Sequence, residues 1–260
     1  MFDQIFSQKK TQLIPFLMAG HPDIETTERL ACALVEEGIE ILELGVPFSD
    51  PMADGPVIQK ASELALSNGT NLSAVLKLAE RIHLKSAKLQ IVIFSYFNPL
   101  LAFGLDRYAR EAKQAGVAAT LCVDLPPEEA TLFLDCHFRH GLKNVFLASP
   151  TTSSQRLSLI NECSSAFVYY VSRAGVTGEQ KNLSPSLAGE IATLRKSVSR
   201  PVAVGFGISD SIQAEQVSRF ADGVVIGSAL TRLITDSSSK VQGEERVREF
   251  MRSCIRAMKS

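Results

Sequence analysis

Eight short β-rich runs alternate with segments of helical periodicity along almost the whole chain. Several of these runs, such as LQIVIF (89–94) and VFLA (145–148), are apolar at consecutive positions. Strands of this kind are covered on both faces, which is typical of parallel sheets packed by crossover helices. The expected strands are Leu13–Ala19, Ile39–Val46, Leu89–Phe97, Ala119–Leu125, Asn144–Ser149, Ala166–Ser172, Val202–Phe206 and Val224–Gly227.

Helices are expected between these strands and near the C-terminal end of the chain. Eight alternating units in 260 residues predict an α/β fold, a single-domain (β/α)8 TIM barrel with extra helices. A doubly wound open sheet is the main alternative, but no G-x-G-x-x-G follows the first strand. No linker divides the chain, so we expect one domain over residues 1–260. The expected helices are Thr26–Glu37, Pro56–Ser67, Leu72–Lys85, Asp106–Ala115, Glu128–His140, Gln155–Cys163, Ser184–Lys196, Ser211–Ser218 and Gly243–Met258.

Net charge, cysteine spacing and hydropathy argue against a nucleic-acid partner and against a secreted or membrane protein. The net charge is −1 and no basic stripe is visible, which argues against recognition of a nucleic-acid backbone. The five cysteines are widely spaced without a C-x-x-C pair, as expected for reduced thiols. No stretch has the ~18 apolar residues that a membrane helix needs, and the N-terminus lacks a signal peptide. We therefore expect a cytoplasmic protein.

Glu43 is a carboxylate inside the apolar run LELGV. Period-two geometry places Ile41, Glu43 and Gly45 on one side of the strand, and Leu42 and Leu44 on the other. Both sides are apolar, so Glu43 is desolvated whichever way it points, and its pKa should rise. A carboxyl group with a raised pKa suits general acid or base catalysis near neutral pH.

Asp54 follows in a loop that contains three prolines and a glycine. We expect its surroundings to be wetter, so that it stays ionised and accepts a hydrogen bond. Two carboxylates in different environments can divide the roles of acid and anion. The structural alternative is that Glu43 pairs with a buried base and that Asp54 caps the helix after Pro56.

Glycine-rich turns follow the last three expected strands: SRAGVTG (172–178), GFGIS (205–209) and GSAL (227–230). Glycines let backbone N–H groups approach an anion closely, and a short helix after Gly227 and Ser228 adds its positive dipole end. TIM barrels frequently bind phosphate at the loops after strands 7 and 8. These turns therefore predict a phosphate site.

Two further features surround the expected phosphate site. Tyr96 and Tyr169 fall near strand ends and predict an aromatic pocket, whereas core packing competes for Phe16 inside the first strand. The segment Arg173–Leu187 is long for a connection between strand and helix. It is a candidate lid that closes over substrate and excludes water.

Other catalytic classes find little support. His83, His137 and His140 fall on expected helices, where surface or capping roles are commoner than catalysis. His21 follows the first strand and could face the barrel mouth, but nothing nearby has metal-ligand spacing, so we expect no metal. Neither a G-x-S-x-G elbow nor a Walker motif is present.

The segment LELGVPFSDPMADGP (42–56) closely resembles the signature of the tryptophan synthase alpha subunit family. The resemblance covers nearly the whole chain, because six further segments look like family segments in the family's order. Two departures, His21 and Ala174, remove no group that the family chemistry needs. The six segments are PFLMAGHPD, SYFNPL, DLPPEE, VSRAGVTG, VGFGIS and GVVIGSAL.

The resemblance implies a lyase that cleaves indole-3-glycerol phosphate to indole and glyceraldehyde 3-phosphate in the last step of tryptophan biosynthesis. The family's catalytic Glu falls on Glu43 and its catalytic Asp on Asp54. Its phosphate-binding positions fall on Gly178, Gly207, Gly227 and Ser228. Its pocket positions fall on Phe16, Ile58, Tyr96 and Tyr169, with Thr177 in the mobile loop.

The resemblance also implies a partner. Family members pair with a beta subunit that carries pyridoxal phosphate and receives the indole, in an alpha2-beta2 heterotetramer, and this chain itself is expected to hold no cofactor. The loop from Pro47 to Asp54 and the segment around Asn98–Pro99 would lie near that partner. Two alternatives stay open: a stand-alone lyase that releases free indole, or a catalytically weak barrel that acts mainly as an allosteric activator of the beta subunit.

Overall fold

The computed structural model describes residues 2–8, 10–171, 186–205 and 207–259. Eight parallel strands form a closed barrel in chain order, and pairing of β1 with β8 closes the ring. The strands are β1 (Gln12–Met18), β2 (Ile41–Gly45), β3 (Gln90–Ser95), β4 (Val117–Cys122), β5 (Lys143–Ala148), β6 (Phe167–Val171), β7 (Val202–Gly205) and β8 (Gly223–Ile226).

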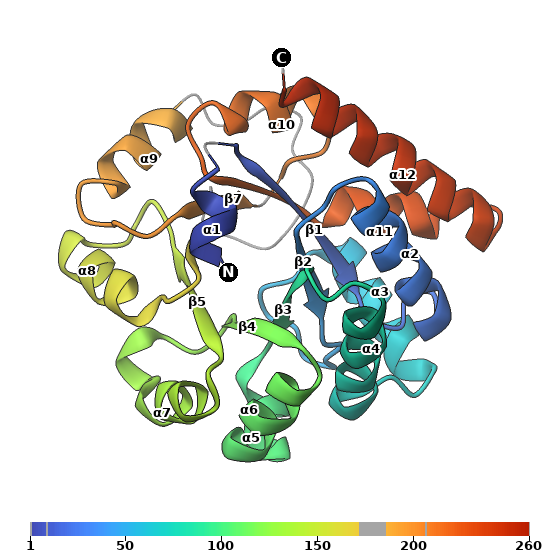
Figure 1. Cartoon of the computed structure of the whole chain (residues 1–260), viewed down its shortest axis with the longest axis horizontal. Helices are drawn as coiled ribbons and strands as arrows, with labels where there is room; N and C mark the ends of the chain where they lie inside the picture. Colours follow the sequence, from blue (N-terminus) through green and yellow to red (C-terminus); the bar gives the residue numbers. More distant parts are fainter. Residues whose placement is uncertain (1, 9, 172–185, 206, 260) are drawn as a thin grey trace.

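Helices surround this barrel, and α12 lies along its outer side (Figure 1). The expected TIM-barrel fold with extra helices is confirmed. The helices are α1 (Phe2–Phe6), α2 (Ile24–Glu36), α3 (Pro56–Ser67), α4 (Leu72–Lys85), α5 (Phe97–Phe103), α6 (Leu105–Gln114), the 3-10 turn η1 (Pro127–Glu129), α7 (Thr131–His140), α8 (Ser154–Cys163), α9 (Leu187–Leu194), α10 (Ser211–Ser218), α11 (Ser228–Thr235) and α12 (Lys240–Ala257).

The core consists of two apolar layers, as the runs of consecutive apolar residues predict. One layer lies between the strands and the surrounding helices and includes Leu42 and Leu44 of β2. The other fills the barrel interior and includes Ile41, which points to the opposite side of the same strand. Alternate residues of β2 therefore face the two layers, and Glu43 shares the interior side with Ile41.

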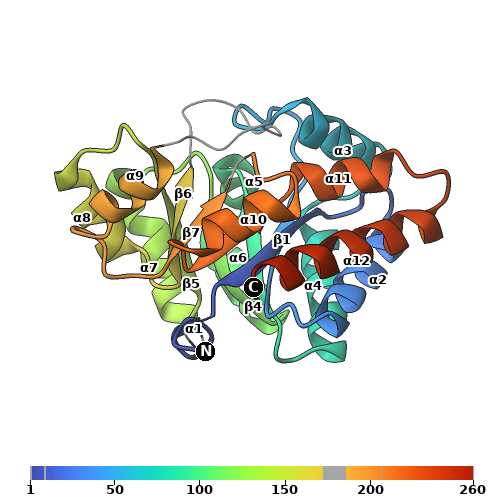
Figure 2. The same cartoon turned by 90° about the horizontal axis from the view of Figure 1, so that it is seen from above.

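Several element bounds differ from the expectation, and two differences concern the two ends of the barrel. The strand expected to reach Phe97 ends at Ser95, because the Asp124 carboxylate accepts a hydrogen bond from the Phe97 N–H (2.7 Å) at the start of α5. The short helix α1 was not expected from periodicity. It lies at the end of the barrel opposite α3 and α11, as Figure 2 shows, and its Phe2 ring packs on Phe167.

Candidate active site

Glu43 lies in the barrel interior, near the carboxyl end of β2. Its Cα pairs with Phe16 of β1 and Val92 of β3, and both of these side chains belong to the interior layer. The residue is 1% exposed, and neither carboxylate oxygen has a hydrogen-bond partner among the described residues. Burial raises the pKa of Glu43 to about 8, because an ionised carboxylate is poorly solvated there. Glu43 is therefore protonated at neutral pH.

Asp54 lies in the loop between β2 and α3, at the mouth of the barrel. The expectation of wetter surroundings is wrong: Asp54 is 3% exposed, and burial raises its pKa to about 6. The Tyr96 hydroxyl limits this rise by donating a hydrogen bond to the carboxylate. The same hydroxyl oxygen accepts the Ala53 N–H (3.0 Å), which fixes the loop to the end of β3. Asp54 is mostly ionised at pH 7.

Tyr169 of β6 brings the two carboxylates into one site. Burial and the negative charges of Glu43 and Asp54 all raise the pKa of its hydroxyl. On the neighbouring strand β7, a Cβ added to Gly205 would lie 2.0 Å from the Tyr169 hydroxyl oxygen. The hydroxyl thus occupies space that only a glycine at the end of β7 leaves open, and the sequence expectation did not identify this close approach.

Phe16 connects the carboxylate site with the expected phosphate end. Its ring packs against the edge of Phe94 and lies beside Gly45, where an added Cβ would come within 2.5 Å of it. On its other side, a Cβ on Gly227 would stand 3.4 Å from Phe16, an ordinary contact. Ile58 of α3 is buried in the same interior layer. Four predicted pocket residues, Phe16, Ile58, Tyr96 and Tyr169, therefore surround the interior side of the mouth.

The expected phosphate positions fall partly within the described structure. Gly227 is the N-cap of α11 and Ser228 is its first residue, so the short helix expected at this point is present. Gly207 has a φ of 90° in the turn after β7. Gly178, Thr177 and most of the expected lid Arg173–Leu187 lie outside the described residues.

The prediction of a surface or capping role is wrong for His137. His137 of α7, expected at the surface, is fully buried with its ring 3.9 Å from that of Phe133. Tertiary packing decides this, because α7 turns that face toward β5 and α6. His21 is also buried, and its Nε2 lies 3.2 Å from the Thr235 hydroxyl of α11. The contact between His21 and Thr235 could not be predicted from sequence periodicity, because the two residues are 214 positions apart.

Within the described ranges, no cluster of three or more His, Cys, Asp or Glu side chains is arranged to hold a metal ion. The same part of the chain contains no helix with the length and apolarity needed to cross a membrane.

A closed parallel barrel with a protonated and an ionised carboxyl group at its mouth defines the class of barrel enzymes that work by acid–base catalysis. The family model described as "Tryptophan synthase alpha chain" matches residues 2–259. The chain belongs to the tryptophan synthase alpha chain family, a family of lyases that cleave indole-3-glycerol phosphate. The family and the lyase function expected from the sequence are thus confirmed.

Individual relatives agree with this assignment. The tryptophan synthase alpha chain of Geobacter sulfurreducens is 45% identical over 94% of this chain and 92% of its own length. That of Geotalea uraniireducens is 41% identical, covering 100% and 95%. Tryptophan synthase subunit alpha from Legionella pneumophila superposes with a TM-score of 0.92 at 35% identity, covering 99% of this chain and 98% of that one. A Mycobacterium tuberculosis tryptophan synthase structure gives 0.89 at 35% identity, covering 100% and 96%.

Proposed function

We propose that Glu43 and Asp54 are the catalytic pair with which this chain cleaves indole-3-glycerol phosphate. The observation that carries the proposal is the buried Glu43 carboxyl, which has no hydrogen-bond partner among the described residues and a pKa raised to about 8. A carboxyl group that is neutral at pH 7 and points into an apolar barrel can act as a general acid. Asp54, with a lower pKa, supplies the anion.

The reaction requires proton transfer at two atoms of the substrate. Glu43 donates its proton to C3 of the indole ring, and Asp54 accepts a hydrogen bond from N1–H, which stabilises the positive charge that develops on the ring. The Glu43 carboxylate then takes the proton of the side-chain hydroxyl. The bond from C3 to the side chain breaks, its electron pair returns to the ring, and an aldehyde and neutral indole result.

We assign the substrate phosphate to Gly178, Gly207, Gly227 and Ser228. The start of α11 supports this assignment, because backbone N–H groups and the helix dipole both favour an anion there. Phe16 lies between this end and Glu43, so a ligand that reaches both would pass its ring. The pocket is completed by Phe16, Ile58, Tyr96, Tyr169 and Thr177.

The family's name implies a beta subunit as partner, and we propose an alpha2-beta2 heterotetramer in the cytoplasm in which only the beta subunit carries pyridoxal phosphate. Exposed apolar side chains at the barrel mouth support an interface there. Met52 lies in the loop after β2, and Leu101 lies on α5, close to Asn98–Pro99. Both fall in the segments expected to lie near the partner.

The direct test of the catalytic pair is Glu43→Gln, which keeps the shape of the side chain but holds no acidic proton. We expect kcat to fall at least ~10²–10⁴-fold, because a positioned general acid contributes about that much. Glu40→Gln is the matched control: this carboxylate lies just before β2, at the other end of the strand, and is partly exposed. Indole release is measured with and without a beta subunit. Near-normal turnover by Glu43→Gln would refute the assignment.

The same assay separates the two alternative functions. A stand-alone lyase would release indole at full rate without the beta subunit. A catalytically weak activator would raise beta-subunit turnover, but its wild type would release indole no faster than Glu43→Gln does. We expect neither result.

A further inference from the structure

His21 lies just after β1 and is 4% exposed. It contacts α11, the helix that follows β8, because β1 and β8 are neighbours in the closed barrel. Its Nε2 lies 3.2 Å from the hydroxyl oxygen of Thr235, the last residue of α11. A buried side chain on one strand end therefore contacts the far end of the phosphate-facing helix.

The direction of this hydrogen bond follows from the neighbours of Thr235. A hydroxyl has a single hydrogen, and Thr235 donates it to the carbonyl oxygen of Thr231 (2.9 Å). The imidazole must then be the donor, with a proton on Nε2. Burial lowers the pKa of His21 to about 4, so the ring is neutral at pH 7 and Nε2–H is its only N–H donor.

The contacts continue along the helix to the phosphate end. The Thr231 N–H donates to the carbonyl oxygen of Gly227 (3.0 Å), the N-cap residue of α11. His21, Thr235, Thr231 and Gly227 thus form a line of hydrogen-bonded groups from one end of α11 to the other. Thr231 in the middle of this line is buried. A shift of Thr235 would be transmitted to Gly227 and Ser228, because an eight-residue helix moves as a unit.

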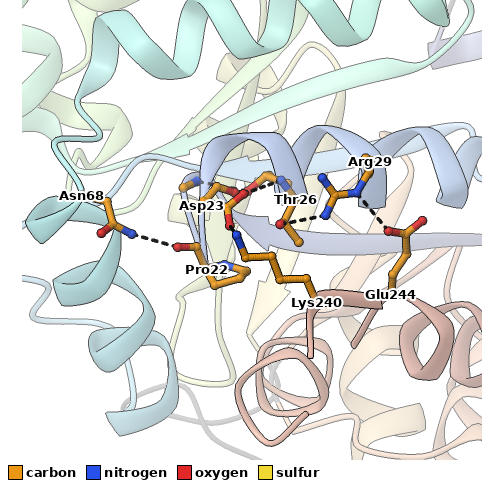
Figure 3. Close-up of polar contacts among 9 residues, drawn as sticks. Pro22, Asp23, Thr26, Arg29, Asn68, Lys240 and Glu244 are labelled. Atoms are coloured by element: carbon orange, nitrogen blue, oxygen red, sulfur yellow. Dashed lines mark hydrogen bonds and ion pairs between the residues drawn. The ribbon is translucent and has the colours of Figure 1, made fainter. Parts of the chain in front are cut away.

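The loop that carries His21 is held on several sides (Figure 3). The Asn68 side-chain amide donates to the Pro22 carbonyl oxygen (2.8 Å), which joins the loop to the turn between α3 and α4. The Asp23 carboxylate accepts the Thr26 N–H (2.7 Å) at the start of α2 and pairs with Lys240 of α12 (2.6 Å). His21 is therefore attached to a fixed frame and can position α11.

We propose that His21 is a positioning residue that acts through Thr235 to hold the N-terminus of α11 where it binds the substrate phosphate. This inference rests on the proposed function in one respect, the assignment of the phosphate to Gly227 and Ser228. His21 itself does not touch the reacting atoms. Its loss should weaken binding of the phosphate group and leave the proton transfers by Glu43 and Asp54 unchanged.

The first test is Thr235→Val, which removes the hydroxyl and keeps the shape of the side chain. Thr235 is exposed, so the variant should fold. One lost hydrogen bond is worth about a three- to tenfold effect on binding. We expect KM for indole-3-glycerol phosphate and the inhibition constant of inorganic phosphate to rise by that factor, with kcat within about twofold of wild type. The assay uses the chain in the presence of its beta subunit.

Thr193→Val is the matched control, because the Thr193 hydroxyl also bonds a carbonyl four residues earlier but has no histidine partner among the described residues. Its KM should be unchanged. Thr235→Ser keeps the hydroxyl and should bind phosphate as wild type does.

Two variants of the imidazole test the donor. His21→Gln keeps an N–H donor near Nε2 and should retain the wild-type KM, whereas His21→Leu should match Thr235→Val. The double variant His21→Leu/Thr235→Val should bind no more weakly than either single variant, since both remove one contact. Additive effects, an unchanged KM in Thr235→Val, or a fall in kcat alone would overturn the inference.

Failure of the proposed function gives a different result. If inorganic phosphate does not compete with the substrate on the wild-type chain, the phosphate assignment is wrong and the positioning role falls with it. If it competes on wild type and equally on Thr235→Val, only the positioning role is wrong.

Discussion

Glu43 and Asp54, the proposed catalytic pair, are both buried at the barrel mouth, and their pKa values differ. Burial raises both pKa values, but Asp54 starts from a lower one and accepts a hydrogen bond from Tyr96. Between about pH 6 and pH 8, Glu43 is therefore protonated while Asp54 is ionised. This is the combination that protonation of indole C3 requires.

The pH dependence of kcat/KM should follow from these two pKa values. Activity should be lost as pH falls through about 6, where Asp54 becomes protonated, and as pH rises through about 8, where Glu43 loses its proton. Steady-state kinetics between pH 5 and 9 should give a bell-shaped profile.

Asp54→Asn provides the control for this profile. Its residual activity should lack the acidic limb, because no carboxyl group remains to be protonated at position 54. If Asp54→Asn still shows a bell-shaped pH profile with both limbs, the acidic limb belongs to another group.

At the scale of elements, the carboxyl ends of neighbouring strands approach so closely that only glycine fits at two of them. Gly45 at the end of β2 leaves room for the Phe16 ring, and Gly205 at the end of β7 leaves room for the Tyr169 hydroxyl. The absence of a Cβ at these two glycines therefore shapes the pocket as much as the aromatic rings do. The Phe16 and Tyr169 rings fill the space that the glycines leave.

We expect Gly45→Ala to destabilise the fold by about 1–3 kcal/mol, because overpacking would push Phe16 from its place. The added Cβ would stand 2.5 Å from the ring. Gly189→Ala in α9 is the control: nothing lies within 4 Å, and an exposed helical alanine should stabilise by about 0.5–1 kcal/mol. Urea unfolding measures both. Equal effects would mean that Phe16 has room to move.

For the whole molecule, the mouth with the proposed catalytic pair lies at one end of the barrel and α1 lies at the opposite end (Figure 2). The connections after the strands gather at the mouth, including the loop with Met52 and the short helix α5 with Leu101. Exposed apolar side chains beside the proposed site would suit a partner that receives an apolar product from it.

Met52→Asp should weaken binding of the beta subunit, because a desolvated charge would be introduced at the proposed interface. Val241→Asp is a matched control, since Val241 on α12 is 75% exposed and Met52 is 76% exposed. Titration with the beta subunit should show an affinity loss for Met52→Asp alone, with circular dichroism unchanged in both. Equal affinities would place the interface elsewhere.

The sequence alone determined the strand and helix alternation, hence the barrel, and it singled out Glu43 as a desolvated carboxylate. These conclusions are local, because the apolar residues on both sides of each strand report its burial directly. The bounds of α3, α4 and α10 agree with the expectation for the same reason.

Only the tertiary structure decided which polar groups are covered by distant parts of the chain. Asp54 stands in a polar-looking loop, yet Tyr96 from the end of β3 closes over it. His137 looks like a surface residue until α7 packs on the barrel. His21 meets Thr235 only because β8 closes against β1. The physical reason is that sequence periodicity describes which faces of one helix or strand are apolar. Desolvation of a polar group depends instead on which other elements pack against that face.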